Sequence, residues 1–562
     1  MGIVLVDGKE VEVGDHERLN GIQAAARAGI DIPRYCWHPG LTVVASCRMC
    51  LVESGTRDAA TGKISMVPKL VPACQTPAKD GTVFVTNSEN VRKSRAMVEE
   101  DLLIDHPIDC PICDKAGECL LQDYHFEHGQ TARRADVKPF TSRRREMGDT
   151  VTLFVDRCVM CTRCVRFTRE ITGTSELLVI NRGSHEEIDV FPGYPLENKM
   201  SGNVVDLCPV GALGDKDFLY RQRVWFMKKH PGVCTLCSTG CSIYVEENQD
   251  SVQRLKPREN PAVNQWWMCD EGRYGWHYVH SHERVIEPRR WKTDPRGDAH
   301  AAIDWRTLVD ELPIALGQAG KLAVVLSPHL TVEEAYLLAK LVRSIDLEAV
   351  IALGPVPVVG EDEKFKNGFT IHAEKCPNRR GVEAVIQHFT GTVLGWSDFL
   401  NRVDTGEFGG VWVTAGYPHP WIDEEDAKRF AGIKQLVVQD LFDSPLWDRA
   451  HWQIPAAAYP EREGSYVNFQ ERLQFAQRAI RPPSGVWADS YLYWRLLAMP
   501  GLFNARKALS EVAAAIPYFS LAGAVIPEQG VDLKLNKIAP DGVDPAFMPN
   551  EGAPKDKTQT IA

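Results

Sequence analysis

The sequence has no apolar run that approaches the roughly 18 residues needed to cross a bilayer. Its first residues, MGIVLVDGKE, lack the basic and apolar regions of a secretory signal. Neither G-x-G-x-x-G nor G-x-x-x-x-G-K-[ST] occurs, so nothing indicates that the chain itself binds NADH or ATP. With 64 basic and 75 acidic residues the net charge is −11, which argues against nucleic acid as the main partner. We therefore expect a cytoplasmic chain whose membrane role, if it has one, comes through partners.

Cysteine is almost confined to the first half of the chain, because Cys376 is the only one of sixteen cysteines after Cys269. Thiolate sulfur is a soft ligand that selects iron–sulfur clusters or zinc, and four ligands complete one cluster. The other fifteen cysteines and one histidine form four groups of four, which are Cys36, Cys47, Cys50 and Cys74; His106, Cys110, Cys113 and Cys119; Cys158, Cys161, Cys164 and Cys208; and Cys234, Cys237, Cys241 and Cys269. Four such sites in series predict a path for single electrons.

The first group has a loose spacing, with ten residues between Cys36 and Cys47 and twenty-three between Cys50 and Cys74. Three cysteines in a loop beside a sheet, with a fourth that arrives later in the chain, are typical of a [2Fe–2S] ferredoxin site. Zinc or free buried thiols are the alternatives. We interpret this group as the ligands of a [2Fe–2S] cluster.

The second group has only three cysteines and needs a fourth ligand. His106 lies four positions before Cys110, and neutral imidazole is a suitable ligand for iron. His125 and His128 are interpreted as structural. The group predicts a [4Fe–4S] cluster, and its potential should be raised because imidazole replaces a negatively charged thiolate.

The third group resembles one half of a two-cluster bacterial ferredoxin. In those proteins each run reads C-x2-C-x2-C-x3-C-P, and the last cysteine ligates the cluster of the other run. Here the run from Cys158 to Cys164 is followed by Thr168 where the fourth cysteine would stand, whereas Cys208-Pro209 is a fourth ligand without its own run. The group therefore predicts one [4Fe–4S] cluster, with its twin lost.

The fourth group has the spacing C-x2-C-x3-C-x27-C and is similar to the N-terminal [4Fe–4S] site of molybdopterin oxidoreductases. The similarity extends past the ligands to the stretch WMCDEGRYGW around Cys269. A zinc ribbon is the alternative. We interpret this group as a third [4Fe–4S] site.

The order of these sites and the stretches CVMCTRCVRF, DLCPVGAL and VNQWWMCDEGR resemble the large iron–sulfur subunit, the G subunit, of bacterial NADH:quinone oxidoreductase, respiratory complex I. The resemblance is close through residue 285 and weaker after it. It implies relay of electrons from a flavin- and NADH-binding subunit through one [2Fe–2S] and three [4Fe–4S] clusters toward quinone, with no substrate-binding active site on this chain. The implied partners are that subunit, peripheral iron–sulfur subunits and, indirectly, the membrane arm. The implied location is peripheral, on the cytoplasmic side of the inner membrane.

The implied fold class is α+β with several domains. In chain order these are a [2Fe–2S] ferredoxin-like β-grasp domain (1–86), a one-histidine/three-cysteine [4Fe–4S] segment (87–145), a bacterial [4Fe–4S] ferredoxin-like domain (146–225), a molybdopterin-oxidoreductase-type [4Fe–4S] domain (226–285), a degenerate molybdopterin-oxidoreductase-like α/β domain (286–526) and an extended or disordered tail (527–562).

Local signals predict several elements within this division. Strands over 3–6 and 11–13 flank the turn Asp7-Gly8, and Ser88 is placed to cap a helix that runs to about residue 104. Thr331 and Glu334 form a capping box for a helix through residue 342. Further strands are expected at 322–326, 347–353, 411–414 and 435–438, and their alternation with helices predicts a parallel sheet.

In the C-terminal half, IPAAAYPEREGSYVNFQERLQ resembles the molybdopterin-enzyme segment E-x-G-T-x-x-N-x-E-G-R-x-Q. The positions that fit are Glu461 or Glu463, Gly464, Asn468, Arg472 and Gln474, whereas Ser465 replaces Thr and Gln470-Glu471 replace Glu-Gly. The chain ends about ninety residues later, and the only thiol left as a molybdenum ligand is Cys376, which we interpret as an ordinary free cysteine. We therefore expect no molybdopterin and a scaffolding role for this region.

Two related enzyme classes share parts of this pattern. An [FeFe] hydrogenase shares the first two cluster types but needs further cysteines, including adjacent pairs, and no Cys-Cys pair occurs here. An iron–sulfur subunit of a soluble NAD-linked hydrogenase or formate dehydrogenase complex remains the alternative function.

Overall fold

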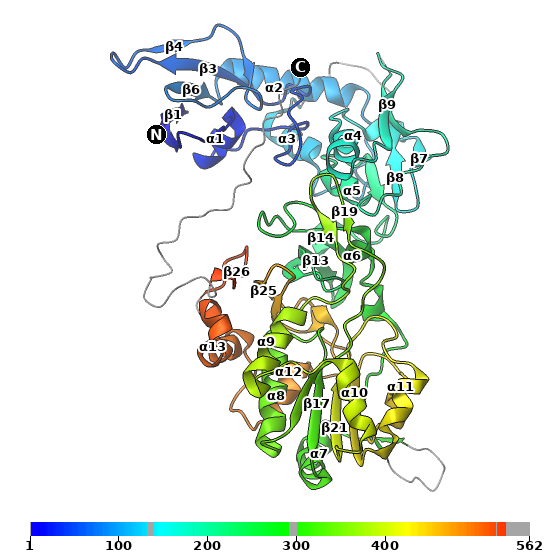
Figure 1. Cartoon of the computed structure of the whole chain (residues 1–562). Coiled ribbons are helices and arrows are strands. Elements are labelled where there is room, and N and C mark those ends of the chain that lie inside the picture. Colours follow the sequence, from blue (N-terminus) through cyan, green and yellow to red (C-terminus); the bar gives the residue numbers. More distant parts are fainter. Residues whose placement is uncertain are drawn as a thin grey trace, which may run out of the picture.

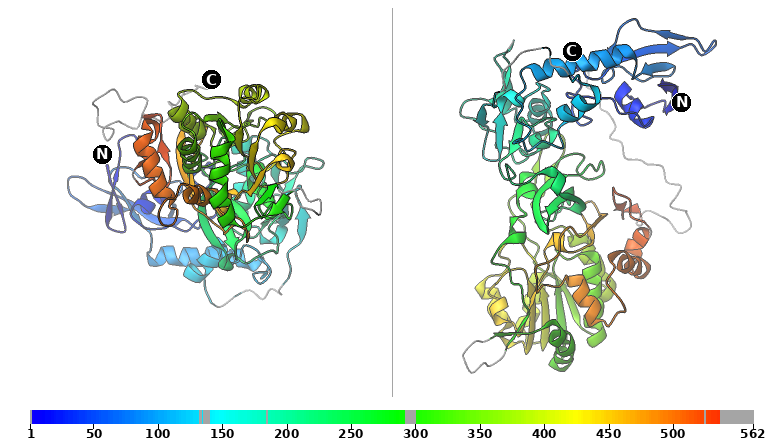
Figure 2. Two further views of the ribbon diagram at one scale, coloured as in Figure 1. Left: turned by 90° about the horizontal axis from the view of Figure 1, so that it is seen from below. Right: turned by 180° about the vertical axis from the view of Figure 1, so that it is seen from behind.

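The computed structural model describes residues 2–131, 134, 140–183, 185–291, 300–523 and 525–535. Figure 1 and the rear view in Figure 2 show an elongated molecule with two ends. The blue and cyan part of the chain forms one end, and the green to orange part forms the other. No helix within the described residues is long and apolar enough to span a bilayer.

The N-terminal part is a mixed sheet with one packed helix. The strand order is β2-β1-β6-β3-β4, with β5 paired to β3, and β1 runs antiparallel to β2 and parallel to β6. The predicted hairpin is confirmed, since Asp7 and Gly8 both have positive φ angles between β1 and β2. The elements are β1 (Gly2–Val6), β2 (Lys9–Val13), α1 (Gly21–Arg27), β3 (Leu51–Arg57), β4 (Ile64–Met66), β5 (Val71–Pro72) and β6 (Thr82–Val85).

Two helices carry the chain from this sheet to the next. The first is α2 (Glu89–Ile104), and the backbone N–H of Val91 donates to the hydroxyl of Ser88, which confirms the predicted cap. The second is α3 (Leu120–His128), and Cys119 is its N-cap residue. The loop that contains the first two cysteines of the second group lies between them.

The third-group region is built from small sheets around short helices. Its three-stranded sheet has the order β11-β8-β7, and a separate hairpin pairs β9 with β10. The elements are β7 (Arg144–Glu146), β8 (Val151–Phe154), α4 (Arg163–Phe167), β9 (Leu177–Ile180), β10 (Glu187–Val190), α5 (Asn203–Leu207) and β11 (Leu213–Asp215).

The fourth-group region lies between the two ends of the molecule (Figure 1). Its strands follow one another in an antiparallel sheet, β12-β13-β14. A second sheet, β24-β25-β26, packs on it through Val233, Tyr466 and Ala476, although its strands come more than two hundred residues later. The elements are β12 (Lys228–Val233), β13 (Ser242–Asn248), β14 (Ser251–Pro257), α6 (Asp270–Tyr274), β24 (Gly464–Val467), β25 (Arg472–Ala476) and β26 (Val531–Asp532).

The C-terminal end is a seven-stranded sheet of order β16-β15-β23-β22-β21-β17-β18. The five strands from β23 to β18 are parallel, as predicted, whereas β15 runs antiparallel to β23 and β16 antiparallel to β15. The predicted capping box of α8 is present. The strands are β15 (Arg289–Trp291), β16 (His300–Ala302), β17 (Leu322–Leu326), β18 (Val350–Leu353), β21 (Gly410–Thr414), β22 (Gln435–Asp440) and β23 (Trp452–Pro455).

Helices cover this sheet, and a hairpin leaves it toward the rest of the molecule. The helices are α7 (Trp305–Ala319), α8 (Val332–Ile345), α9 (Arg379–Thr390), α10 (Trp396–Asp404), α11 (Glu424–Lys428), α12 (Asp489–Leu496) and α13 (Ala505–Ala515). The hairpin of β19 (Glu363–Lys364) and β20 (Thr370–Ile371) reaches the third-group region, where Lys366 donates to the carbonyl of Arg169.

The predicted tail from residue 527 falls mostly outside the described residues. Its first part differs from an extended or disordered tail, because β26 pairs with β25 and Leu533 is fully buried. Packed structure therefore continues at least to Leu533.

Candidate metal centres

The first group is brought together by the long loop between α1 and β3 and by the turn after β5. Cys36, Cys50 and Cys74 are buried, and Cys47 is half-buried. The thiols contact one another in a row, Cys47 with Cys36, Cys36 with Cys74, and Cys74 with Cys50. A hydrogen bond from Cys47 is the main cause that lowers the pKa of Cys36 below its usual range. All four predicted members therefore meet at one place.

The second group is more open. Cys113 is buried, Cys119 is half-buried at the start of α3, and Cys110 is exposed. Burial raises the pKa of Cys119 to about 11 and lowers the pKa of His106 to about 4, so His106 is a neutral imidazole at pH 7. Cys113 lies within electrostatic reach of both other cysteines. The charged neighbours of His106 are Arg157 and Asp109, so the ligand role of His106 stays a prediction.

The third group lines one cavity. Its walls hold all four predicted cysteines and apolar side chains from β8 and β11, among them Leu153 and Leu213. The loop that carries the first three cysteines is tightly wound, since Met160 and Thr162 both take left-handed backbone conformations with φ of 46° and 58°. Burial raises the pKa of Cys161 to about 11. An enclosed, apolar cavity with four inward-lining thiols is what a cluster site requires.

The fourth group is the most deeply buried. Its four cysteines are each 5 % exposed or less. Cys269 begins α6, and its sulfur accepts a hydrogen bond from the backbone N–H of Gly272 at 3.3 Å. A Cβ atom on Gly272 would lie 3.1 Å from the sulfur of Cys234 and 3.4 Å from that of Cys269. The absence of a side chain at Gly272 therefore leaves room beside two of the four thiols.

The molybdopterin-like motif of the C-terminal half supports the loop of the fourth group. The side-chain amide of Asn468 donates to the carbonyl of Thr239 at 3.1 Å, and that of Gln474 donates to the carbonyl of Gly240 at 2.7 Å. The oxygen of the Gln474 amide accepts from the hydroxyl of Ser242. The residues that match the motif thus hold the backbone between Cys237 and Cys241.

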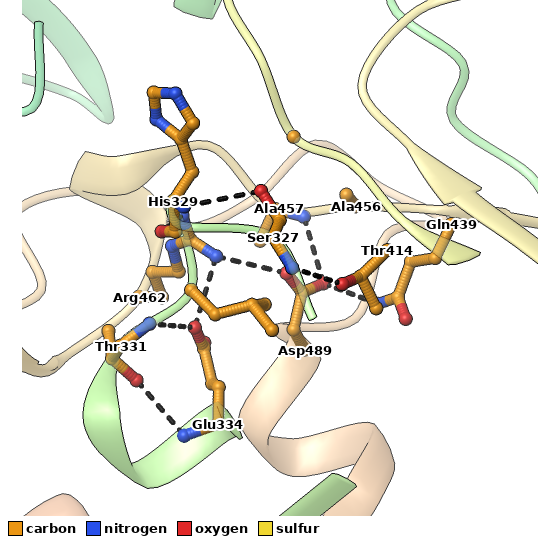
Figure 3. Close-up of polar contacts among 12 residues, drawn as sticks. Ser327, His329, Thr331, Glu334, Thr414, Gln439, Ala456, Ala457, Arg462 and Asp489 are labelled. Atoms are coloured by element: carbon orange, nitrogen blue, oxygen red, sulfur yellow. Dashed lines mark hydrogen bonds and ion pairs between the residues drawn. The ribbon is translucent and has the colours of Figure 1, made fainter. Parts of the chain in front are cut away.

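A buried ionic network surrounds Arg462, which belongs to the same segment of sequence (Figure 3). Arg462 contacts Glu334 and Asp489 at 3.1 Å each and donates to the backbone carbonyl of His329 at 2.8 Å. Burial raises the pKa of Asp489 to about 7. The network ties α8, α12 and the end of β17 together, and the ring of His329 points away from it (Figure 3). Arg462, Glu334 and Asp489 are thus paired with one another inside the network.

A cavity of about 680 Å³ opens at the carboxyl ends of the parallel strands, next to the fourth group. Leu236 and Glu271 line it from the fourth-group region, and His329 and Tyr417 line it from the sheet. Cys376 is fully buried and is not among the lining residues. Cys376, the one thiol outside the four groups, therefore does not line the cavity in which a ligand bound at this end of the sheet would lie.

Buried arginines, which the sequence did not single out, join the groups to one another. Arg166 donates to the carbonyls of Cys36 in the first group and Cys161 in the third, at 2.5 and 3.0 Å. Arg157 pairs with Asp109 beside the second group and donates to the carbonyl of Gly211. A Cβ atom on Gly211 would lie 2.1 Å from the sulfur of Cys113. The third group is therefore joined to both the first and the second.

The donor chemistry of the groups fits iron–sulfur clusters. Burial raises the pKa of most of these thiols, and metal binding is what would deprotonate them at neutral pH. In the part of the chain that the structure describes, no three or more His, Cys, Asp or Glu side chains are arranged as ligands of a metal ion. The fit rests on the shared cavity, on the mutual contacts of the thiols and on their burial.

Family models match four successive parts of the chain. They are a 2Fe-2S iron-sulfur cluster binding domain over 3–89, the NADH-ubiquinone oxidoreductase-G iron-sulfur binding region over 95–134, the ferredoxin-like domain of NADH-quinone oxidoreductase subunit 3 over 148–214 and the molybdopterin oxidoreductase Fe4S4 domain over 227–281. These matches and the mixed α/β structure confirm the predicted fold class.

Curated relatives agree with these models. The G subunit of NADH-quinone oxidoreductase from Rickettsia felis is 33 % identical over 60 % of this chain and 48 % of its own length. The corresponding proteins of Salmonella typhimurium and Escherichia coli are 34 % identical over 63 % of this chain and 38 % of their own length. The chain thus spans half or less of the length of these relatives.

A chain of a solved NAD+-reducing [NiFe]-hydrogenase in the H2-reduced state is also similar, at 27 % identity over 40 % of this chain and 91 % of that chain, with a TM-score of 0.32. The family models and the curated relatives together identify the chain as a homologue of the G subunit of NADH-quinone oxidoreductase.

Proposed function

We propose that this chain is an electron-relay subunit of an NADH:quinone oxidoreductase and passes electrons from a flavin- and NADH-binding subunit toward quinone. The first group would hold one [2Fe–2S] cluster, and the second, third and fourth groups one [4Fe–4S] cluster each. These clusters supply reversible one-electron oxidation and reduction. The chain itself makes and breaks no substrate bonds and holds no molybdopterin.

The observation that carries this proposal is the contact of the third group with two other groups. Its cavity is lined by Cys158, Cys161, Cys164 and Cys208, and buried arginines join it to the first group and to the second. Apolar side chains around the first, third and fourth groups keep water away from most of their thiols, and the arginines fix the loops relative to one another. These contacts support transfer of electrons between the third group and each of the other two.

Partner subunits are part of the proposal, and the surface near the second group supports them. Ile108 and Ile112 flank the exposed Cys110, and Trp225 and Phe226 lie on a segment held to the same loop by Arg223. These four side chains are between 49 % and 59 % exposed. Such apolar exposure beside a candidate redox centre is typical of a surface that another subunit covers. We further propose that the chain lies peripherally on the cytoplasmic side of the inner membrane, held by those subunits.

Electron paramagnetic resonance of the reduced protein, combined with iron and sulfide quantification, tests the assignment. We expect about fourteen iron atoms per chain and signals of one [2Fe–2S] and three [4Fe–4S] clusters. Stoichiometric zinc in place of iron in any group would remove that group from the relay. Molybdenum in the purified complex would contradict the scaffold role of the C-terminal end.

A further inference from the structure

Two buried arginines of α4 lie between the first and third groups. Arg163 is 7 % exposed and Arg166 is 2 % exposed. Arg166 donates to the carbonyls of Cys36, Thr42 and Cys161, at 2.5, 2.6 and 3.0 Å. Arg163 donates to the carbonyl of Trp37 at 2.7 Å and to that of Leu207 at 3.2 Å. Each guanidinium therefore bridges the loop of the first group and a segment of the third.

The charges of these two arginines are not matched by a carboxylate among the ion pairs of the described residues. Five other buried arginines are paired in this way, namely Arg157 with Asp109, Arg254 with Glu246, Arg273 with Asp206, Arg284 with Glu461 and Arg462 with Glu334 and Asp489. Arg95 and Arg258 are also buried and donate to backbone carbonyls, but neither bridges two of the cysteine groups. Glu170 attracts Arg166, but its oxygens accept from the backbone and the hydroxyl of Thr42 instead. Because an uncompensated buried cation is costly, its counter-charge has to come from elsewhere in the same place.

The two guanidinium groups lie against the loops that carry the cysteines of both groups. Arg166 donates to the carbonyls of Cys36 and Cys161 themselves. Arg163 donates to the carbonyls of Trp37 and Leu207, which directly follow Cys36 and directly precede Cys208. Besides Glu170, the other ionisable neighbours are Tyr124, His38 and Arg34, and Arg34 forms an ion pair with Asp31. The cysteines of the two groups, once deprotonated by metal binding, would therefore supply the missing negative charge.

We propose that Arg163 and Arg166 are positioning residues shared by the first and third groups, which hold the two loops at a fixed separation and supply the counter-charge of both clusters. The inference rests on the proposed function and names residues that tune it. A cluster becomes more negative by one unit when it accepts an electron, and a fixed cation nearby stabilises that reduced form. Removal of one cation should therefore lower the reduction potentials of both centres together.

Redox titration of the purified complex, followed by electron paramagnetic resonance, measures those potentials. In Arg166→Gln we expect the potentials of the first and third clusters to fall, with that of the fourth unchanged and with unchanged iron and sulfide content. Arg166→Lys, which keeps the charge, should restore both potentials toward the wild-type values. Arg169→Gln is the matched control, because Arg169 is exposed on the following turn and pairs with Glu170. This change should shift neither of the two potentials.

Unchanged potentials in an Arg166→Gln complex with full cluster content would overturn the inference. A shift of only one of the two potentials would also contradict a shared role. If Arg166→Gln loses a cluster, the same titration is done on Arg163→Gln. Unchanged reduction potentials of the first and third clusters in that variant would overturn the inference as well. The proposed function fails separately, because it requires the signals of both clusters in the wild-type complex before any substitution is made.

Discussion

The third and fourth groups each consist of four cysteines, but their surroundings differ. The third is joined to two other groups by buried arginines. The fourth is braced by amides from the molybdopterin-like motif, at Asn468 and Gln474. The contacts around a centre therefore suggest its role, relay for the third group and structural support for the fourth. Their ligands alone do not separate the two roles.

The largest effect is expected from Cys208→Ala. This change removes one of the four thiols that line the third-group cavity. It should abolish electron transfer from NADH to quinone, while reduction of an artificial acceptor at the flavin is largely kept. Cys376→Ala is the matched control, because it removes a buried thiol outside the four groups. Unchanged quinone reduction in a complex shown to lack that cluster would defeat the relay role.

Cys237→Ala should act on assembly more than on turnover. Metal binding to a site that is absent in the unfolded chain contributes directly to folding, so loss of this ligand should reduce the amount of assembled complex. Activity normalised to assembled complex should remain close to that of the wild type. A fall to near zero in well-assembled material would place the fourth group on the electron path and remove the contrast with the third.

His106 offers a test of the more open second group. His106→Cys should keep the cluster and lower its potential, because a thiolate adds negative charge, whereas His106→Ala should lose it or leave it labile. Redox titration and iron content measure both outcomes, and His128→Ala is the control. A full and spectroscopically unchanged cluster in His106→Ala would make His106 an ordinary loop residue.

A pH effect is expected from Glu333, which accepts hydrogen bonds from the backbone and hydroxyl of Ser465 at 2.7 and 2.8 Å. Burial raises its pKa to about 7, so the ionised form is disfavoured in the folded protein. The folded state binds the proton more tightly than the unfolded state, so stability should fall as pH rises from about 4.5 to 7 and then level off, by on the order of 3 kcal/mol. Glu333→Gln should flatten this dependence in denaturant unfolding. An unchanged slope would show that Glu333 is not its source.

The smallest effect is expected from Gly272→Ala. The new Cβ would crowd the sulfurs of Cys234 and Cys269, and overpacking of this size costs about 1–2 kcal/mol. Thermal unfolding should show the loss in the fourth-group region, with the signals of the other clusters unaffected. Gly432→Ala, where no atom lies within 4 Å of the new Cβ, is the control. Equal stability of both variants would mean that the loop adjusts freely.

Much of the fold could be predicted because its signals are local. The hairpin at Asp7-Gly8, the cap at Ser88 and the capping box at Thr331 depend on residues within a few positions, and each is present. The antiparallel strands β15 and β16 and the sheet β24-β25-β26 were not predicted, because short strands of ordinary composition carry little periodicity. The packing of β26 depends on a partner strand about sixty residues earlier in the chain.

The candidate sites likewise combine features that local sequence predicts with features that depend on residues far apart in the chain. Spacing was enough to propose the ligands, since chelating loops are short. It could not identify Arg166, whose contact with Cys36 joins residues 130 positions apart, although Arg166 stands inside the most specific motif, CVMCTRCVRF. The available signal was a charged residue two positions after a cluster cysteine, at a position that must be buried.

The brace of the fourth group has a consequence for the order in which the protein is made. The proposed ligands of the first three groups all lie before residue 209, so those sites can close while the ribosome is still extending the chain. The loop from Cys237 to Cys241 waits for Asn468 and Gln474, which are 229 and 234 residues beyond the carbonyls that they hold. The fourth metal centre would then be the last of the four to mature, after the chain has been synthesised and folded at least to residue 474.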